Sequence, residues 1–413
     1  MPVTLPPEQS PEPRPAPPRA VVWLGLLIVA MVVGVVSTLL TWPKNEPTGT
    51  AWFWVRPLVI PPLAWGVVFG LRLYYYEQES ERIDADNETL REDRENALRF
   101  ASEPLAVAGY TYLTSLGDDE VASMHASGVT ALEAQTSQDG SEGVRHSALA
   151  ALGDSDGSNR YRTCFEDLIA AIEPLVATIP RDVPFGVRLQ LPDDADRDAL
   201  LETWQTCWDA KDMRRAEAVP VPADQGVMAL DEWLDNRGGP ALEKFLLFVA
   251  VQLHDTPPQN SAEAAVAMLL GWAPLAGRRR IPLVAHLHRP VEAEPGGATD
   301  APIATALLWG RTAGDKVDDL WQAGLDGSEK SAVAKSMSDL SINVSQSENL
   351  SAIHDIDTSM GRPGVAAGWL ALALGIEHAK QNNNPQLVAW REGALRFAVV
   401  QPVAPTDKAD SNA

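Results

Sequence analysis

The sequence has few of the residues and short motifs on which many enzyme families depend. Its 413 residues include two cysteines, Cys164 and Cys207, which lie 43 positions apart and outside any CxxC pair. This spacing fits neither a zinc nor an iron–sulfur site. The chain also contains no P-loop and no GxGxxG segment, so the common signatures of nucleotide and dinucleotide binding are absent.

Positive charge is scarce as well. Lys and Arg total 33 against 56 Asp and Glu, which gives a net charge of −23 at pH 7. The first 76 residues contain five basic and three acidic side chains, so the remainder of the chain carries the whole deficit. A polyanion of this size repels nucleic acid and anionic lipid headgroups. We therefore expect no nucleic-acid partner and favour a basic protein partner.

One long apolar run dominates the N-terminal region. From Ala20 to Trp42 there is no charge in 23 residues, and about 20 apolar residues in a helix are enough to cross a hydrocarbon core. A secretory signal peptide is the alternative, but this run is longer than a usual signal core and no Ala-x-Ala cleavage site follows it. The run predicts a membrane-spanning helix.

A second apolar stretch follows after a polar break and extends to Tyr76. Its uncharged run, 57–71, is short, but Arg, Trp and Tyr residues flank it as interfacial anchors do. We expect a helical hairpin over 20–76. Both outer flanks are richer in Arg than the loop between the two stretches, which places the N-terminus and the soluble domain in the cytoplasm, at the inner membrane.

Beyond the hairpin, helix-like and strand-like patterns alternate. An amphipathic run from Cys164 and another from Asp194 predict helices, the continuous apolar run Phe245–His254 predicts a strand buried on both faces, and a very apolar helix is expected over Gly364–Lys380. The runs 121–135, 261–272 and 315–325 are also interpreted as helices, the second with Ser261 as N-cap, and 281–293 as a strand. This alternation predicts a mixed α/β fold.

The predicted organisation has five parts. They are a proline-rich disordered tail (1–19), a transmembrane hairpin (20–76), a charged helical stalk (77–103), an α/β soluble domain (104–402) with a disordered insertion (136–159), and a disordered C-terminal tail (403–413).

The segment from Gly361 to Leu374, GRPGVAAGWLALAL, resembles the GHTxGAAGxxxLxxAL segment of β-ketoacyl synthases and other thiolase-like condensing enzymes. The resemblance implies a thiolase-like domain in which a strand, a glycine turn and a buried Ala-rich helix follow one another. In that family the histidine of this segment activates the acyl chemistry. Here Arg362 holds its position, and a guanidinium is charged near neutral pH and cannot act as a general base.

The family's nucleophilic cysteine opens a buried helix within a turn of small residues. Cys164 stands between Thr163 and Phe165, which is not such a turn, so the resemblance implies a fold without its catalytic set. Among the histidines, His286 and His288 share a face of their predicted strand, and His354 with Asp355 and Asp357 is arranged similarly. Spacing marks no third metal ligand for the pair, and we interpret these histidines as structural. No catalytic, cofactor-binding or metal-binding residue is predicted, and no cofactor.

The order of parts also resembles that of adaptor proteins encoded with type VI secretion phospholipase effectors. In both, a hydrophobic N-terminal region and a linker precede strand–helix repeats, and here one strand ends in His288-Arg289-Pro290-Val291. This resemblance implies a non-catalytic, membrane-tethered adaptor that binds a secreted lipase effector or a spike component. Two alternatives remain: a thiolase-like acyl-transfer or condensing enzyme that uses Cys164 or Cys207, and a structural subunit of a membrane complex.

Overall fold

The chain forms two compact units, residues 4–98 and residues 1–3 with 99–413. The parts described by this computed structural model are residues 3, 5–6, 12–44, 46–135, 143–149, 152, 157–211, 213–222, 224–236, 238–347 and 351–403. The tails expected to be disordered therefore lie partly outside the described residues, as does most of the predicted insertion at 136–159.

The first unit is a helical hairpin made of α1 (Ala20–Thr41), α2 (Ala51–Leu58) and α3 (Ile60–Ala101). The break between α2 and α3 precedes two prolines in the first turn of α3, where a missing N–H removes no helical hydrogen bond. The Trp65 Nε1 atom donates to the Trp23 carbonyl over 2.9 Å, which joins α3 to α1. From Ile60 onward, the rest of the second apolar stretch and the charged segment after it form one continuous helix, α3.

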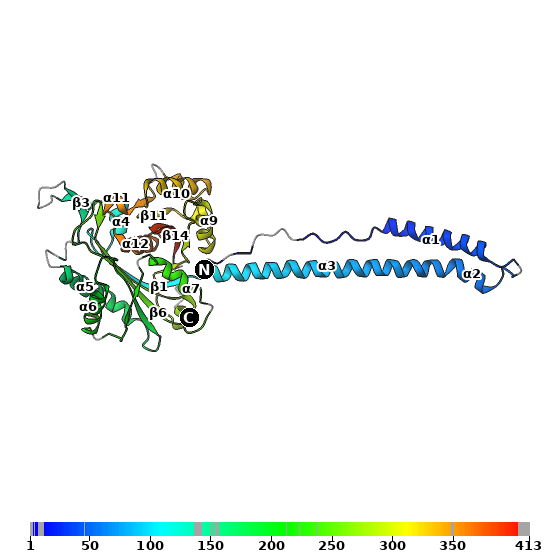
Figure 1. Cartoon of the computed structure of the whole chain (residues 1–413), viewed down its shortest axis with the longest axis horizontal. Helices are drawn as coiled ribbons and strands as arrows, with labels where there is room; N and C mark the ends of the chain where they lie inside the picture. Colours follow the sequence, from blue (N-terminus) through cyan, green and yellow to red (C-terminus); the bar gives the residue numbers. More distant parts are fainter. Residues whose placement is uncertain are drawn as a thin grey trace, which may run out of the picture. The chain divides into compact units, whose positions relative to one another are not determined.

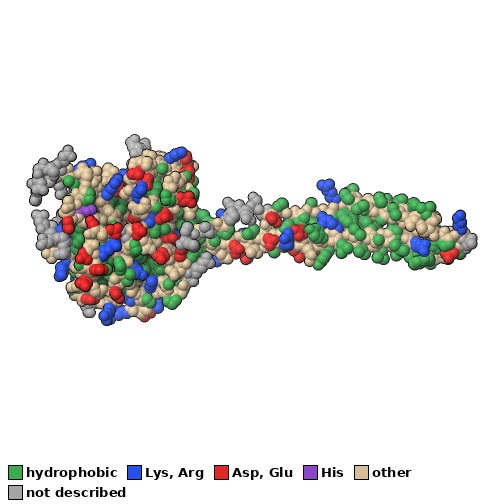
Figure 2. All heavy atoms as spheres, viewed as in Figure 1, with side chains coloured by type: hydrophobic (Ala, Val, Ile, Leu, Met, Phe, Trp, Pro, Cys, Tyr) green, Lys and Arg blue, Asp and Glu red, His purple; other side chains and the backbone are tan. Residues whose placement is uncertain are grey.

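Apolar side chains on these helices face outward. By length and composition, α1 and the helical stretch Ala51–Ala101 could both cross a membrane. Val33 is 60% exposed and Leu40 is 80% exposed, and Figure 2 shows hydrophobic side chains covering this part of the unit, with charged ones gathered farther along it. Exposed apolar surface of this extent marks a site of interaction with membrane or protein.

The second unit is built on one mixed sheet of eleven strands, in which two halves repeat the same strand order. Counted along the chain, the five strands of each half lie in the order third, second, fourth, fifth, first. The fifth strand is antiparallel to both of its neighbours in each half. The strands are β1 (Leu105–Leu113), β4 (Phe185–Gln190), β5 (Ala218–Val221), β6 (Phe245–Gln252) and β8 (Ala264–Trp272), and then β9 (Ala285–Leu287), β11 (Asp319–Ala323), β12 (Ile353–Asp355), β13 (Gln386–Glu392) and β14 (Ala394–Pro402).

The two halves meet where β1 pairs with β9, antiparallel, with Leu105 opposite Leu287. The short strand β10 (Val291–Glu292) pairs with β14 and lies outside the strand order given above. A separate small sheet contains β2 (Glu133–Gln135), β3 (Val144–Ser147) and β7 (Ser261–Ala262).

Helices cover both faces of the sheet (Figure 1). Along β6, Phe248 and Ala250 point into the same apolar cluster as α12, whereas Leu247 and Val249 point into the cluster that contains α5 and α6. The cluster that contains α12, called the inner cluster below, also includes residues from β13 and β14, so α12 packs against both half-sheets. A third cluster covers the outer face of the second half. The helices concerned are α5 (Gly157–Ala177), α6 (Arg197–Asp209), α9 (Asp300–Trp309), α10 (Gly327–Asp339) and α12 (Ala367–Asn382).

The strongest sequence patterns form the elements expected of them. The helices predicted from Cys164 and Asp194 are α5 and α6, the apolar run Phe245–His254 is β6, and the expected Ala-rich helix is α12 after a short 3₁₀ turn at Gly364–Ala366. Both faces of β6 are covered, as its continuous apolar sequence predicts.

The helix predicted over 261–272 is wrong, and Ser261 caps no helix. This stretch forms β7 and β8, and β8 is hydrogen-bonded to β1 on one side and to β6 on the other. Its residues are apolar at both odd and even positions, which fits a buried helix and a buried strand equally well. Hydrogen bonding to β1 and β6 on its two sides stabilises this stretch as a strand.

The helix predicted over 315–325 is also wrong. Its centre is β11, a parallel strand held between β12 and β13. The strand predicted over 281–293 is interrupted between β9 and β10, at a position that includes Pro290. In both stretches, pairing with strands that are distant in sequence determines which residues form a strand.

The helix predicted over 121–135 is much shorter than expected. It ends at Ala126 as α4 (Val121–Ala126), because Gly128 takes a φ of 81° that a helix cannot continue through. The insertion predicted as disordered at 136–159 includes β3 and the first residues of α5. The polar local sequence obscured β3, which is held by pairing with β2 and β7.

Burial of α12 yields a stability prediction. Leu372 is fully buried on α12, whereas Leu308 on α9 is 40% exposed. We expect Leu372→Ala to lower the free energy of unfolding by about 2–5 kcal/mol, because it leaves a cavity in the inner cluster. Leu308→Ala should cost less than about 1 kcal/mol. Urea unfolding of the full chain in detergent, followed by tryptophan fluorescence, measures both, and equal costs would contradict this packing.

Candidate functional site

The N-terminal end of α12 is the first candidate site, because a turn there joins the two halves. Gly361 has a φ of 97°, and a Cβ on it would lie 2.5 Å from the Ser261 carbonyl oxygen. The Arg362 N–H donates to the Asn260 carbonyl over 2.8 Å, and the Ala262 N–H donates to the Arg362 carbonyl over 2.9 Å. The glycine is therefore required for this close approach.

A side chain from the first half occupies the start of the helix itself. Gln252, at the end of β6, accepts a hydrogen bond at Oε1 from the Val365 N–H over 3.1 Å. Gly364 has a φ of 51°, and a Cβ on it would overlap the Gln252 side chain. The amide that could otherwise face a ligand at this helix end is thus already paired.

Arg362 points outward from this turn. Its side chain is 61% exposed, and its Nε lies 3.4 Å from the Asp357 Oδ2 atom. Burial raises the pKa of Asp357, and a hydrogen bond from the Gly324 N–H opposes this shift. The turn therefore presents an exposed cation, where the resembled segment carries a histidine.

The strand order of the first half identifies the position that corresponds to α12. In the second half, α12 connects the third strand, β12, to the fourth, β13. The same connection in the first half runs from β5 to β6 and covers residues 222–244. It contains a 3₁₀ turn at Gly226–Met228 and the short helix α7 (Ala229–Leu234), and no cysteine. In the resembled family a buried helix of this kind carries the nucleophile.

A buried carboxylate closes the start of this short helix. Glu392, the last residue of β13, accepts hydrogen bonds at Oε2 from the Val227 N–H over 3.1 Å and from Arg396 Nη1 over 2.8 Å. Burial raises the pKa of Glu392, while these donors oppose the shift. Gly226 has a φ of 47° and no room for a Cβ beside that carboxylate. A fixed ionic contact between Glu392 and Arg396 occupies this turn.

Both cysteines lie on the opposite face of the sheet from α12. Cys164 on α5 and Cys207 on α6 belong to the outer cluster of the first half. Cys164 is fully buried, and burial raises the pKa of both thiols. A raised pKa disfavours the thiolate, which is the nucleophilic form. The structure therefore brings neither thiol to the Gly361 turn.

A short string with a central serine matches a hydrolase motif by its letters alone. Residues 153–157, GDSDG, fit the literal GxSxG consensus of serine hydrolases. Ser155 lies outside the described residues, and β3, the strand that precedes it among the described residues, ends at Ser147 rather than at this string. We therefore assign no catalytic role to this string.

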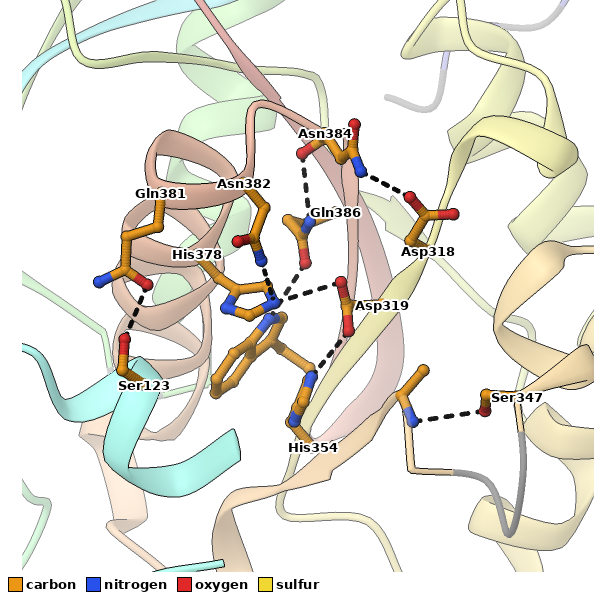
Figure 3. A network of polar contacts seen from close by, with 12 residues as sticks. Ser123, Asp318, Asp319, Ser347, His354, His378, Gln381, Asn382, Asn384 and Gln386 are labelled. Carbon is orange, nitrogen blue, oxygen red and sulfur yellow. Dashed lines mark hydrogen bonds and ion pairs between the residues drawn. The ribbon is translucent and has the colours of Figure 1, made fainter. Parts of the chain in front are cut away.

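The histidines are grouped differently from the sequence expectation. Burial lowers the pKa of His286, and lowers that of His288 to about 4, and the structure places no third ligand with them among the described residues. Instead His354 lies beside Asp319 and His378 (Figure 3). Asp355 pairs with Lys330 over 2.6 Å. Sequence spacing could not reveal this group, because its members come from β11, β12 and α12.

No protein-family model matches the sequence, and no curated protein matches it. Solved structures do. The ketosynthase from module 6 of the bacillaene synthase of Bacillus subtilis 168 has a TM-score of 0.52 and 10% identity, over 73% of this chain and 73% of that chain. A β-ketoacyl synthase from Burkholderia phymatum STM815 has a TM-score of 0.51 and 12% identity, over 73% and 100%. The KS7 domain of the oxazolomycin ketosynthase OzmH from Streptomyces albus JA3453 has a TM-score of 0.54 and 12% identity, over 75% and 76%.

These similarities show the fold. The second unit has the mixed α/β fold of ketosynthases, and the thiolase-like fold predicted from the Gly361 segment is confirmed. At 10–12% identity they carry no activity over to this chain.

The position of the cysteines gives a prediction about their reactivity. We expect Cys164 and Cys207 to resist iodoacetamide at pH 8 in the native protein, because both thiols are buried and poorly ionised. In denaturing urea both should react fully. Mass spectrometry of the labelled peptides measures this, and native labelling of either cysteine at the rate of an exposed thiol would contradict the packing of α5 and α6.

Proposed function

We propose that this chain is a membrane-tethered adaptor whose ketosynthase-like domain binds a protein partner and performs no cysteine-dependent condensation. One observation carries the proposal: the connection that corresponds to α12 in the first half contains no cysteine, and a Glu392 carboxylate fills the start of its short helix. Covalent acyl transfer of the ketosynthase type needs a thiolate nucleophile at an accessible position. Neither Cys164 nor Cys207 is at an accessible position.

The hairpin supports the tether. At its turn, the Arg56 guanidinium lies 5.6 Å from the Trp42 ring and 5.7 Å from the Trp52 ring, measured to the ring centroids. Trp and Arg clustered at the end of an apolar helix are typical of a membrane–water interface. The outward-facing apolar side chains of α1 find a suitable environment in lipid. The Arg-rich outer flanks favour a cytoplasmic domain at the inner membrane.

The acidic domain favours a partner with a basic surface. The order of parts, which resembles adaptors of type VI secretion phospholipase effectors, makes such an effector or a spike component the first partner to test. In this role the domain holds the effector at the membrane until it is loaded for secretion.

The ketosynthase fold favours a second candidate, an acyl-transfer or condensing enzyme. It requires Cys164 or Cys207 to reach an acyl donor. Cys164 on α5 and Cys207 on α6 are buried on the outer face of the sheet, so this candidate would need a rearrangement of that layer. We therefore rank it second.

The tether gives a prediction about topology. In a variant without native cysteines, we introduce Thr48→Cys in the hairpin loop or Asn87→Cys on α3. A membrane-impermeant maleimide added to intact inner-membrane spheroplasts should label the first and not the second, since two spans return the chain to the cytoplasm. Detergent should expose both. Labelling of Asn87→Cys alone, or of both before detergent, would contradict the hairpin.

Partner binding gives the functional test. Full-length protein captured from membranes of its own source in mild detergent should bring down a phospholipase effector or spike component in near 1:1 amount. Cys164→Ala and Cys207→Ala should leave the yield unchanged, and salt raised from about 0.1 to 0.5 M should reduce it, because opposite charges are screened. Recovery of acyl carrier protein alone, lost in a folded cysteine variant, would instead support the enzyme.

A further inference from the structure

Three potential metal ligands converge at the end of α12 remote from the Gly361 turn. Asp319 begins β11, His354 lies on β12, and His378 lies near the end of α12. The His354 Nε2 atom is 2.9 Å from Asp319 Oδ1, and the His378 Nε2 atom is 3.2 Å from Asp319 Oδ2. The ligand atoms of all three residues lie within 4.8 Å of one another (Figure 3). Both imidazoles therefore point at one carboxylate.

The surroundings fix these rings. The Trp321 ring stacks on His354 with 4.3 Å between ring centroids and meets His378 edge-on at 5.5 Å. The Trp321 Nε1 atom donates to Gln386 Oε1 over 3.3 Å, which holds the indole in place. His354 is 5% exposed and His378 is 8% exposed. The site is preorganised and mostly shielded from water.

Hydrogen bonding among these residues does not satisfy His378. Its Nε2 atom lies 2.7 Å from Asn382 Nδ2 as well as 3.2 Å from Asp319 Oδ2, and its Nδ1 atom is buried without a partner among the described residues. If Nδ1 carries the proton, Nε2 accepts a hydrogen bond from Asn382 Nδ2 but also faces a carboxylate oxygen, and the Nδ1–H is a buried donor with no acceptor. If Nε2 carries it, Nδ1 is a buried acceptor with no donor, which costs free energy. A cation between Nε2 and the carboxylate removes the clash of lone pairs.

A fourth residue borders the same space. His125 on α4 lies with its ring centroid 5.9 Å from that of His354 and 5.5 Å from that of Trp321. Both of its ring nitrogens are buried without a hydrogen-bond partner among the described residues. A water molecule on a metal ion would offer His125 the donor that its ring otherwise lacks.

We infer that Asp319, His354 and His378 bind one divalent transition-metal ion, and that Zn²⁺ is the ion the set fits best. Two imidazole nitrogens and a carboxylate are ligands that Zn²⁺ accepts, with water in a fourth, tetrahedral position. Mg²⁺ and Ca²⁺ prefer all-oxygen sites. The ion would join β11, β12 and α12, and so fasten the edge of the second half-sheet to the buried helix. This inference is independent of the proposed function.

The test uses the untagged full chain in detergent, stripped with EDTA and titrated with ZnCl₂ in a calorimeter. We expect one saturable site per chain and a higher unfolding temperature with Zn²⁺, since an ion that binds only the native state stabilises it. His354→Gln, His378→Gln and Asp319→Asn should each weaken binding roughly 100-fold or more, because even loss of a supporting partner costs 10–100-fold. Co²⁺ in place of Zn²⁺ should give the visible bands of tetrahedral coordination in the wild type and not in these three variants.

Two matched histidine variants serve as controls. His286→Gln changes a histidine on β9, and His254→Gln changes one whose ring centroid lies 5.8 Å from that of His146, in a histidine pair outside this group. Both should bind Zn²⁺ as the wild type does. Absence of saturable 1:1 binding in the wild type would overturn the inference, as would binding lost in His254→Gln and kept in His354→Gln. The wild-type titration decides the matter even if a ligand variant fails to fold.

Discussion

Burial of α12 between two half-sheets is the constraint on which the rest of the domain depends. All residues from Ala367 to Ala379 are buried, so the helix can have no polar face toward water. It must also be narrow: a Cβ on Gly368 would lie 2.6 Å from the Trp390 ring, and one on Gly375 would lie 3.0 Å from a Val388 methyl. Small residues bring the helix close enough to both half-sheets for their apolar faces to meet on it.

Polar contacts close both junctions between the two halves. Two halves with one strand order offer two places for a buried helix, but the first half has only the short α7 there, and Glu392 and Arg396 from the second half fill the space. At the other junction Gln252 and the backbone of Asn260 and Ala262 close the start of α12. Polar contacts that hold the halves together thus occupy the starts of both helical connections.

The sequence predicts this architecture where local pattern and tertiary environment agree. The apolar run of β6 and the run from Gly364 to Ile376 that leads into α12 are unambiguous, because Gln252 is the one polar residue in the first and the second has none. The pattern fails at β8 and β11, where apolar runs suit helix and strand alike and pairing with strands distant in sequence decides. The Asp319, His354 and His378 group was beyond sequence reasoning for the same reason, since only the sheet and α12 bring its members together. The sequence pattern groups His354 with Asp355 and Asp357, whereas the structure groups it with Asp319 and His378.

The central claim is that a ketosynthase-like domain works here without covalent acyl chemistry. Intact-mass spectrometry of the full chain in detergent, after incubation with a panel of acyl-CoA and acyl carrier protein thioesters, tests it most directly. Our account predicts an unchanged mass for the wild type with every donor. An acyl adduct that maps to Cys164 or Cys207, and that disappears when that cysteine is replaced by Ala, would contradict it.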